Sequence, residues 1–320
     1  MTAPLNVAYS GANGFVGKCL GGTLQNHRKT IAPIALARTG SKSDRRCPDL
    51  INCDVLDWQT ALQGADVYIH LAAYLPFGNQ DTPESEKLLH VANCQAAVTA
   101  LNGFALAGGR KMIFVSSLLV NGATSGATPF KWNDTPKPEN AYARSKLDAE
   151  NALIPHAKSL GVELMILRPP LIYGANVTGK FRTLIEHIKA EKPLPFKNIS
   201  NSRDMIGLRN FCDILVMLSR QFNAIDKPIL LCDRAPISTP DLIEKIAKAY
   251  GVPSRLINIP KLLFLIAKRI PIVGAAVRRL TNDVRVDDQI LRDNCDWEPR
   301  FTIDDEMAAI AQADKQQLNS

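Results

Sequence analysis

The chain of 320 residues is longer than one small domain needs and shorter than three ordinary domains require, so we expect one large domain and a smaller one. Its hydrophobic fraction of 46% and charged fraction of 22% are typical of globular proteins and exclude a disordered or collagen-like chain. Lys and Arg number 38 against 31 Asp and Glu. The net charge of +7 is compatible with a nucleic acid, an anionic membrane or a phosphate-bearing small molecule as partner.

The first residues and the cysteines favour a cytoplasmic protein. The first six residues lack the basic and apolar regions of a secretory signal, and no apolar run reaches the roughly 18 residues of a membrane span. The nearest candidate, 262–267, is interpreted as a buried helix turn. Seven cysteines are widely spaced without a CxxC pair or a Cys/His cluster, which predicts reduced thiols and no bound metal.

Short apolar runs alternate with helix-length stretches through the first half of the chain. Such alternation implies right-handed βαβ crossovers and a doubly wound parallel sheet of the Rossmann type, an α/β fold with helices on both faces. The predicted strands are 6–10, 34–37, 50–53, 67–71, 111–115 and 164–167, and the predicted helices are 16–24, 88–107 and 142–157.

The regular alternation ends after Arg168-Pro169-Pro170. Proline-rich turns then separate the predicted helices 181–190, 239–249 and 261–270. We therefore expect the Rossmann domain to span 1–175, with returning segments near 205–235. A smaller C-terminal domain is expected to comprise most of 176–320.

A glycine-rich turn directly follows the first predicted strand and opens the first helix. Gly11, Gly14 and Gly17 form a GxxGxxG pattern, in which glycine permits the tight turn and the helix N-terminus attracts a pyrophosphate. A turn that binds nothing is the alternative, which the position after the first strand disfavours. The predicted cofactor-binding residues of the turn are Gly11, Asn13, Gly14, Phe15, Val16 and Gly17.

The second predicted strand ends at Arg38, where an NAD site usually has an acidic residue for the adenosine ribose. An arginine suits a 2′-phosphate, and Lys42, Arg45 and Arg46 follow in the next loop. The sequence therefore predicts NADP(H) as cofactor, while NAD(H) and a merely solvated basic loop stay open as alternatives.

Two further segments follow predicted strands and could line the same cofactor. An aspartate after the third strand is placed to accept a hydrogen bond from the adenine amino group. Small residues after the fourth strand leave room for a dinucleotide close to the backbone. The residues predicted here are Asp54, Val55, Leu71, Ala72 and Ala73.

The predicted reacting groups are Ser117, Tyr142 and Lys146. Tyr142 and Lys146 are four residues apart and share one helix face. A phenol with a pKa near 10 is a poor acid–base catalyst at neutral pH. A neighbouring ammonium, together with an oxidised nicotinamide ring, lowers that pKa toward the useful range. Lys146 can also bind the nicotinamide ribose, and Ser117 can orient the substrate oxygen. A YxxxK spacing alone is common, so its value comes from the order of turn, serine and YxxxK.

In this order the chain resembles an extended short-chain dehydrogenase/reductase of the nucleotide-sugar epimerase/reductase branch. The similar subgroup includes UDP-glucose 4-epimerase-like enzymes and 4-ketoreductases that make UDP-N-acetylquinovosamine or its fucosamine epimer. The motifs that carry the resemblance are GANGFVG at 11–17, HLAA at 70–73, SSLLVNG at 116–122, YARSK at 142–146, RPPLIYG at 168–174, STPDL at 238–242 and WEP at 297–299.

The resemblance implies that Ser117 and Tyr142 are the catalytic pair and that Lys146 is their partner. It also implies a family role for Asn93 and UDP-phosphate binding by Arg203 and Arg279, since arginine binds phosphate in a bidentate fork. A surface salt bridge is the alternative for each arginine. The smaller domain would then bind a nucleotide sugar, and the helices of Asn93 and Tyr142 would form a homodimer.

The sequence departs from the subgroup's pattern near the expected sugar. These departures leave the exact sugar open. They are Lys180 in place of Asn, Asp204 in place of Ser, Arg209 in place of Asp, and Asp296 in place of Gly.

The leading interpretation is an NADP(H)-dependent reductase of a UDP-linked 4-keto-6-deoxy-N-acetylhexosamine in bacterial O-antigen synthesis, because Arg38 suits an exchanged NADPH. A 4-epimerase of UDP-glucose or UDP-GlcNAc with tightly bound NAD is the first alternative, and a non-catalytic dinucleotide sensor is the second. A dehydratase is disfavoured because Leu118 and Leu119 occupy its acid–base positions. Nucleic-acid binding lacks a basic helix with aromatic residues. Peripheral membrane binding by 261–280 is less favoured than a helical part of the sugar domain.

Overall fold

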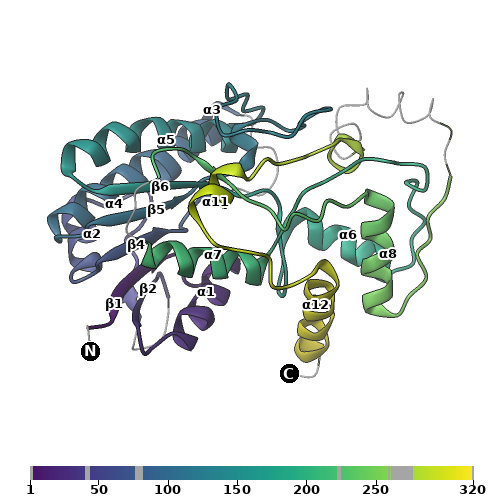
Figure 1. Cartoon of the computed structure of the whole chain (residues 1–320), viewed down its shortest axis with the longest axis horizontal. Coiled ribbons are helices and arrows are strands. Elements are labelled where there is room, and N and C mark those ends of the chain that lie inside the picture. The colour runs from purple at the N-terminus through teal and green to yellow at the C-terminus, as the bar shows by residue number, and fades with distance from the viewer. Residues whose placement is uncertain are drawn as a thin grey trace.

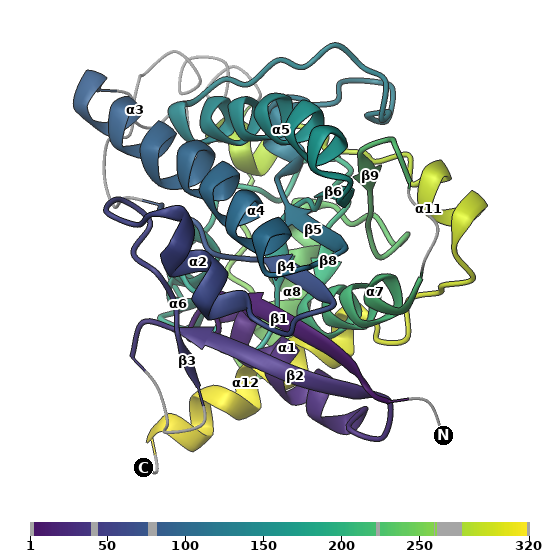
Figure 2. The same ribbon diagram turned by 90° about the vertical axis from the view of Figure 1, so that its left-hand side faces the viewer.

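A seven-stranded parallel sheet forms the centre of the computed structural model, which describes residues 3–39, 44–75, 82–221, 225–258, 260 and 277–318 (Figures 1 and 2). The strand order is β3-β2-β1-β4-β5-β6-β9, so the order reverses between β1 and β4. In doubly wound sheets, ligands bind outside the carboxyl ends of the strands at this switch point. The strands are Leu5–Ser10 (β1), Ile31–Ala37 (β2), Arg45–Arg46 (β3), Val67–His70 (β4), Lys111–Val115 (β5), Glu163–Arg168 (β6) and Ile229–Leu230 (β9).

Helices cover both faces of the sheet because alternate residues of each strand are apolar on opposite faces. In β1, Val7 and Tyr9 pack into the core beneath α1 and α7, whereas Ala8 packs into the core beneath α2, α4 and α5. Figure 2 shows these two helical layers on either side of the strands. The layers comprise α1 (Phe15–Asn26) and α7 (Leu208–Arg220) on one face, and α2 (Val55–Leu62), α4 (Ala96–Leu106) and α5 (Ala141–Leu160) on the other.

A third apolar core lies outside the sheet, where α6, α8 and α12 gather at the right of Figure 1. Phe15, at the start of α1, contacts both this core and the core beneath α1 and α7. The first turn of α1 therefore packs against both parts of the fold. The remaining elements are α3 (Pro83–His90), which continues through a π-helical turn (Val91–Gln95) into α4, β7 (Ile172–Tyr173), α6 (Gly179–Lys189), β8 (Ile206–Gly207), α8 (Thr239–Tyr250), α11 (Gln289–Asn294) and α12 (Ile303–Leu318).

The predicted α/β fold is confirmed, as are five of the six predicted strands and the helices on 16–24, 142–157, 181–190 and 239–249. The predicted helix 88–107 is found as the continuous run of α3, the π-helical turn and α4. The predicted helix 261–270 and the apolar run 262–267 lie outside the described residues.

The predicted strand 50–53 is wrong. The carboxylate of Asp49 accepts hydrogen bonds from the backbone N–H groups of Ile51 and Asn52, at 2.8 and 3.0 Å. This local bonding holds the segment in a turn, because an aspartate side chain offers the backbone an alternative to strand pairing. The third strand is instead β3, which pairs with the end of β2 through Leu36 and Ala37.

Within the described ranges, no helix is long and apolar enough to cross a membrane.

Candidate active site

The glycine turn between β1 and α1 is packed so tightly that two of its positions require glycine. Gly11 has a φ of +71°, and a Cβ there would lie 3.2 Å from the backbone N of Ala72. A Cβ on Gly17 would lie 2.1 Å from the Gly11 carbonyl oxygen. Gly14 donates its N–H to that same oxygen at 2.8 Å. The start of α1 is thus held directly against the end of β4, where a pyrophosphate could approach its N–H groups.

The remaining predicted residues of the turn differ in exposure. Asn13 and Gly14 are exposed, and Phe15 and Val16 are half-buried. The Asn13 amide hydrogen-bonds to Thr39, the second residue after β2. This contact joins the glycine turn to the loop that carries Arg38.

Arg38 is exposed directly after β2, next to β3. Arg45 is occupied elsewhere, since its guanidinium donates to the carbonyl oxygens of Ala61 and Gln63, at 3.1 and 2.6 Å. It therefore stabilises the C-terminal end of α2, as a cation does at a helix C-terminus. Lys42 lies outside the described residues.

Asp54 is the N-cap of α2. Its carboxylate accepts the backbone N–H of Asp57 at 2.8 Å, and the Asp57 carboxylate accepts the backbone N–H of Asp54 at 3.2 Å. This reciprocal capping box fixes where α2 begins, and Val55 is the first residue of the helix. The predicted contact between Asp54 and adenine would have to use an oxygen of this exposed cap.

Leu71, Ala72 and Ala73 follow β4 and run past Gly11. Ala72 is buried and its backbone forms the close contact with the turn, whereas Ala73 is exposed. The predicted residues that make this contact, Gly11, Leu71 and Ala72, thus directly follow the two strands at the switch point.

Lys146 lies on the buried face of α5 and is 2% exposed. Its Nζ donates a hydrogen bond to the Val115 carbonyl oxygen at 3.0 Å and lies 4.8 Å from the centroid of the Phe114 ring. Burial lowers the pKa of Lys146 to about 8, while the nearby Glu150 carboxylate opposes that decrease. The Lys146 ammonium therefore loses its proton more readily than an ordinary lysine does, because its environment is desolvated.

Tyr142 lies one turn before Lys146 and is half-buried. The Lys146 Nζ is 6.0 Å from the centroid of the Tyr142 ring. Burial raises the pKa of Tyr142 to about 12. In the chain without cofactor, desolvation of the phenolate therefore dominates the pKa of Tyr142. The lowering expected from Lys146 together with an oxidised nicotinamide ring stays a prediction.

Ser117 stands two residues after β5, where it caps the short 3-10 turn Leu118–Val120. Its Oγ accepts the backbone N–H of Leu119 at 3.2 Å. The Ser117 hydroxyl proton remains available to a substrate oxygen when the oxygen is used this way.

A buried charge network that we did not predict lies beneath Ser117, Tyr142 and Lys146. Glu150 and Arg168 form a bidentate ion pair at 2.5 to 3.2 Å, with side chains 3% and 5% exposed. The Ser116 hydroxyl donates to Glu150 at 2.5 Å, and Arg168 donates to the Asn121 side chain at 3.0 Å. The signal was present in the sequence, because Tyr142, Lys146 and Glu150 follow one another at four-residue intervals on one helix face.

Asn93 lies in the π-helical turn and is fully buried. Its side chain accepts the Tyr74 backbone N–H at 2.7 Å and donates to the Tyr74 carbonyl oxygen at 3.0 Å. It also donates to the Ser145 hydroxyl at 3.1 Å. Asn93 therefore ties the segment after β4 to α5, next to Tyr142.

The two arginines predicted to bind phosphate have different surroundings. Arg203 is half-buried and donates to the Asn282 carbonyl oxygen at 2.9 Å, whereas Arg279 is exposed. The departure at Asp204 has a partner, because its carboxylate accepts the Arg285 guanidinium at 3.1 Å and the Val286 N–H at 2.8 Å. This pair joins the Arg203 segment to the segment after Arg279.

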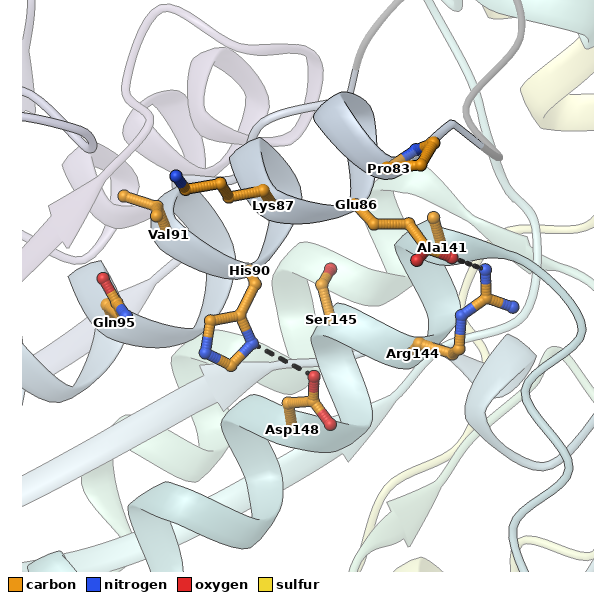
Figure 3. A pocket seen from close by; sticks show the side chains of 10 residues that line it. All are labelled: Pro83, Glu86, Lys87, His90, Val91, Gln95, Ala141, Arg144, Ser145 and Asp148. Atoms are coloured by element: carbon orange, nitrogen blue, oxygen red, sulfur yellow. Dashed lines mark hydrogen bonds and ion pairs between the residues drawn. The ribbon is translucent and has the colours of Figure 1, made fainter.

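A groove of about 470 Å³ lies between α3 and α5 (Figure 3). An ion pair between Glu86 and Arg144 and a hydrogen bond between His90 and Asp148 cross it. The predicted reacting residues do not line it, so the groove is separate from the candidate active site. In the part of the chain that the structure describes, no group of His, Cys, Asp or Glu side chains could hold a metal ion.

A doubly wound sheet with a glycine turn at its switch point, and a Tyr–Lys pair on the adjoining helix, defines a dinucleotide-binding oxidoreductase fold. Residues 9–231, more than half of the chain, match the NAD dependent epimerase/dehydratase family, and the chain belongs to that family. The Cβ-free cradle at Gly11 and Gly17 fits a nicotinamide dinucleotide. The chain is thus an enzyme of this family that uses such a cofactor.

Three similar proteins illustrate the range of this family. The chain is 28% identical over 314 residues to a UDP-glucose 4-epimerase from Vibrio cholerae, covering 97% of this chain and 95% of that protein. A UDP-glucuronic acid 4-epimerase from Bacillus cereus in complex with NAD has a TM-score of 0.77 at 20% identity, covering 98% of each chain. RMD from Pseudomonas aeruginosa, complexed with NADPH, has a TM-score of 0.72 at 21% identity, covering 97% of this chain and 98% of that one. The last two likenesses concern the fold.

Proposed function

We propose that the protein is an NADP(H)-dependent 4-ketoreductase of a UDP-linked 4-keto-6-deoxy-N-acetylhexosamine. The product would be UDP-N-acetylquinovosamine or its fucosamine epimer, for bacterial polysaccharide or O-antigen synthesis. The observation that carries the proposal is the buried Lys146 beside Tyr142, combined with Arg38 in place of an acidic residue after β2. A Tyr–Lys pair supplies a proton, and the arginine favours a phosphorylated cofactor that is exchanged at each turnover.

In this mechanism Tyr142 donates its phenolic proton to the C4 oxygen, which becomes a hydroxyl. Ser117 donates a hydrogen bond to the same oxygen and orients the carbonyl. Lys146 binds the nicotinamide ribose and supplies positive charge next to the phenolate that Tyr142 becomes. A dinucleotide held by the glycine turn, Arg38 and Lys146 would supply the hydride for C4. Proton and hydride together convert the ketone to a secondary alcohol.

The binding residues divide between the two substrates. Arg38 would bind the 2′-phosphate of NADP(H), and the glycine turn its pyrophosphate. Arg203 and Arg279 would bind the UDP phosphates through bidentate contacts. Within this scheme residues 1–175, with returning segments near 205–235, form the dinucleotide domain, and 176–320 form most of the nucleotide-sugar domain.

The helices around Asn93 and Tyr142 would form a homodimer. What supports this proposal is that a groove lies between α3 and α5, on these same helices. We further propose that the enzyme acts in the cytoplasm, where both NADPH and nucleotide sugars are present.

A 4-epimerase is the second candidate, and the 28% identity to a UDP-glucose 4-epimerase favours it. The two reactions use the same residues but differ in cofactor turnover. Purified protein is therefore given UDP-glucose or UDP-GlcNAc without added cofactor, and the sugars are followed by NMR. A reductase leaves both sugars unchanged, whereas steady interconversion with the 4-epimer would overturn the reductase proposal.

A further inference from the structure

Hydrogen bonds inside the sheet connect the glycine turn to the end of β4. The Ser10 Oγ accepts the Ala72 backbone N–H at 3.1 Å and lies 3.0 Å from the Tyr68 hydroxyl oxygen. That hydroxyl lies 2.7 Å from Nδ1 of His70. Ser10, Tyr68 and His70 are completely buried. The three side chains therefore form a continuous hydrogen-bonded network in an otherwise apolar layer.

This hydrogen-bonded network lies directly behind the close contact between the glycine turn and the end of β4. Ser10 precedes Gly11, and Ala72 provides the backbone N that a Cβ on Gly11 would approach to 3.2 Å. A hydroxyl can donate one proton and accept two. Whichever oxygen donates between Tyr68 and Ser10, their bond fixes the Ser10 hydroxyl and leaves a lone pair for Ala72. Tyr68 thus orients the group that holds the two backbones together.

His70 occupies its position at a cost in stability. Its Nε2 is buried and has no hydrogen-bond partner among the residues that the structure describes. Burial, with the charge of Lys146 as a smaller cause, lowers the pKa of His70 to about 3, so the ring is neutral. An apolar side chain would avoid the unpaired nitrogen. The contribution of this imidazole is therefore made through Nδ1, which lies 2.7 Å from the Tyr68 hydroxyl oxygen.

His70, at the other end of the hydrogen-bonded network, packs beneath the site formed by Tyr142 and Lys146. The His70 ring stacks on Phe114, with centroids 5.7 Å apart and planes 29° from parallel. The Lys146 Nζ lies over the other ring of this pair, 4.8 Å from the Phe114 centroid. The hydrogen-bonded network therefore extends from the glycine turn to the Phe114 ring beneath Lys146.

We propose that Tyr68 and His70 are positioning residues for the dinucleotide. Together they hold the Ser10 hydroxyl in the orientation that fixes the Gly11 turn against the Ala72 backbone, so that the turn is preformed before the cofactor binds. Preformed sites bind more tightly because less ordering is left to do on binding. The proposal rests on the dinucleotide site and is independent of which sugar is the substrate.

The test replaces Tyr68 with phenylalanine, which removes only the hydroxyl oxygen. In cofactor-free Tyr68→Phe, amide hydrogen exchange at Ala72 should become at least about five-fold faster, and the Kd for NADPH should rise about three- to ten-fold, as expected for one lost hydrogen bond. The kcat at saturating NADPH should stay within about two-fold, because the reacting groups are untouched. Tyr9→Phe is the matched control, since Tyr9 is a buried tyrosine on the neighbouring strand that faces the opposite core. It should change none of the three values.

A double variant separates positioning from stability. Tyr68→Phe with His70→Phe removes the unpaired imidazole as well, so its unfolding temperature should recover relative to Tyr68→Phe, while its Kd for NADPH stays raised. An affinity that recovers with stability would overturn the proposal, as would Tyr68→Phe with native exchange and native affinity. A wild-type chain that binds neither NADPH nor NADH overturns this proposal and the dinucleotide site together. Failure to reduce a 4-keto sugar overturns only the proposed function.

Discussion

The Nζ of Lys146 lies 3.0 Å from the carbonyl oxygen of Val115, and this hydrogen bond joins the second turn of α5 to the last residue of β5. Ser117 follows Val115 by two residues, and Tyr142 precedes Lys146 by one helical turn. The lysine therefore holds together the two elements that carry the proposed proton donor and its hydrogen-bonding partner.

Tyr142→Phe tests the proton donor. Loss of positioned general-acid catalysis should lower kcat by about 10²- to 10⁴-fold, because nothing else at that position can protonate the C4 oxygen. The Kd for NADPH should change little. Tyr250→Phe is the control, since the Tyr250 hydroxyl bonds Asp314 in the third core region, far along the chain from α5. Full activity in Tyr142→Phe would remove the mechanism.

The pKa of Lys146 predicts how the rate depends on pH. Because that pKa is about 8, the ammonium is lost as pH rises through 8, and kcat/KM should fall there with the slope of one proton. Lys146→Arg keeps its charge at every accessible pH, so its residual activity should show no such decrease. A wild-type rate that is flat from pH 7 to about 9.5 would contradict the role of Lys146.

The same pKa predicts a dependence of stability on pH. The folded chain loses the Lys146 proton near pH 8, whereas the unfolded chain keeps it until about 10.5. Between these values the unfolded state binds more protons, so this residue makes the free energy of unfolding increase with pH. Urea unfolding of the wild type and of Lys146→Met at pH 7.5 and about 9.5 measures it. The variant should lack the increase attributed to Lys146, and identical pH slopes in both proteins would argue against the lowered pKa.

Arg38→Ala tests the cofactor preference. A charge-assisted contact to the 2′-phosphate contributes about 1.5–3 kcal/mol, so the KM for NADPH should rise by about 10- to 100-fold while that for NADH stays nearly constant. Arg45→Ala is the matched control seven residues later, because Arg45 bonds the end of α2. It should affect both cofactors equally. Equal KM values for NADPH and NADH in the wild type would defeat the preference.

Arg203→Ala should weaken the binding of UDP about ten-fold or more and leave the Kd for NADPH unchanged, since one charged phosphate contact is lost. Titration calorimetry with UDP measures the effect directly. Arg300→Ala serves as control because its side chain is 74% exposed and its ion pair with Asp213 is long, at 3.8 Å. Equal UDP affinity in wild type and Arg203→Ala would contradict the assignment.

The buried ion pair should dominate stability near the site. Glu150→Gln leaves Arg168 charged and buried, which costs about 3–5 kcal/mol in the free energy of unfolding. The exposed pair of Lys245 and Asp304 is the comparison, and Asp304→Asn should cost about 0–1 kcal/mol. Urea denaturation of both variants gives the two values. Similar small losses in both would mean that the Glu150–Arg168 pair contributes no more than a surface pair.

The sheet could be predicted from the sequence because its signals are local. Strands buried on both faces appear as short apolar runs, and the glycine turn and the YxxxK spacing each lie within eight residues. The predicted strand at 50–53 was wrong for an equally local reason, because the Asp49 side chain competes for its backbone N–H groups. Helix α2 was missed even though its capping box, Asp54 and Asp57, is visible in the sequence.

The polar contacts that complete the site could not be predicted in the same way. Arg285 is 81 residues from Asp204, and Arg168 is 18 residues from Glu150 on a different element. Only the tertiary fold brings such partners together, and their burial decides which charges are paired. The raised pKa of Tyr142 in the chain without cofactor could not be predicted for this reason, since spacing indicates the neighbour of a group but not how far the group is desolvated.

The most direct test of the proposed function is transfer of deuterium from NADPH that carries deuterium at both C4 positions of the nicotinamide ring. The protein is incubated with this cofactor and a UDP-linked 4-keto-6-deoxy-N-acetylhexosamine, and the product is examined by NMR. A 4-ketoreductase oxidises one NADPH per sugar and leaves deuterium at C4 of the new alcohol. A 4-keto sugar that persists without NADPH oxidation, or an alcohol without deuterium at C4, would contradict the proposed function.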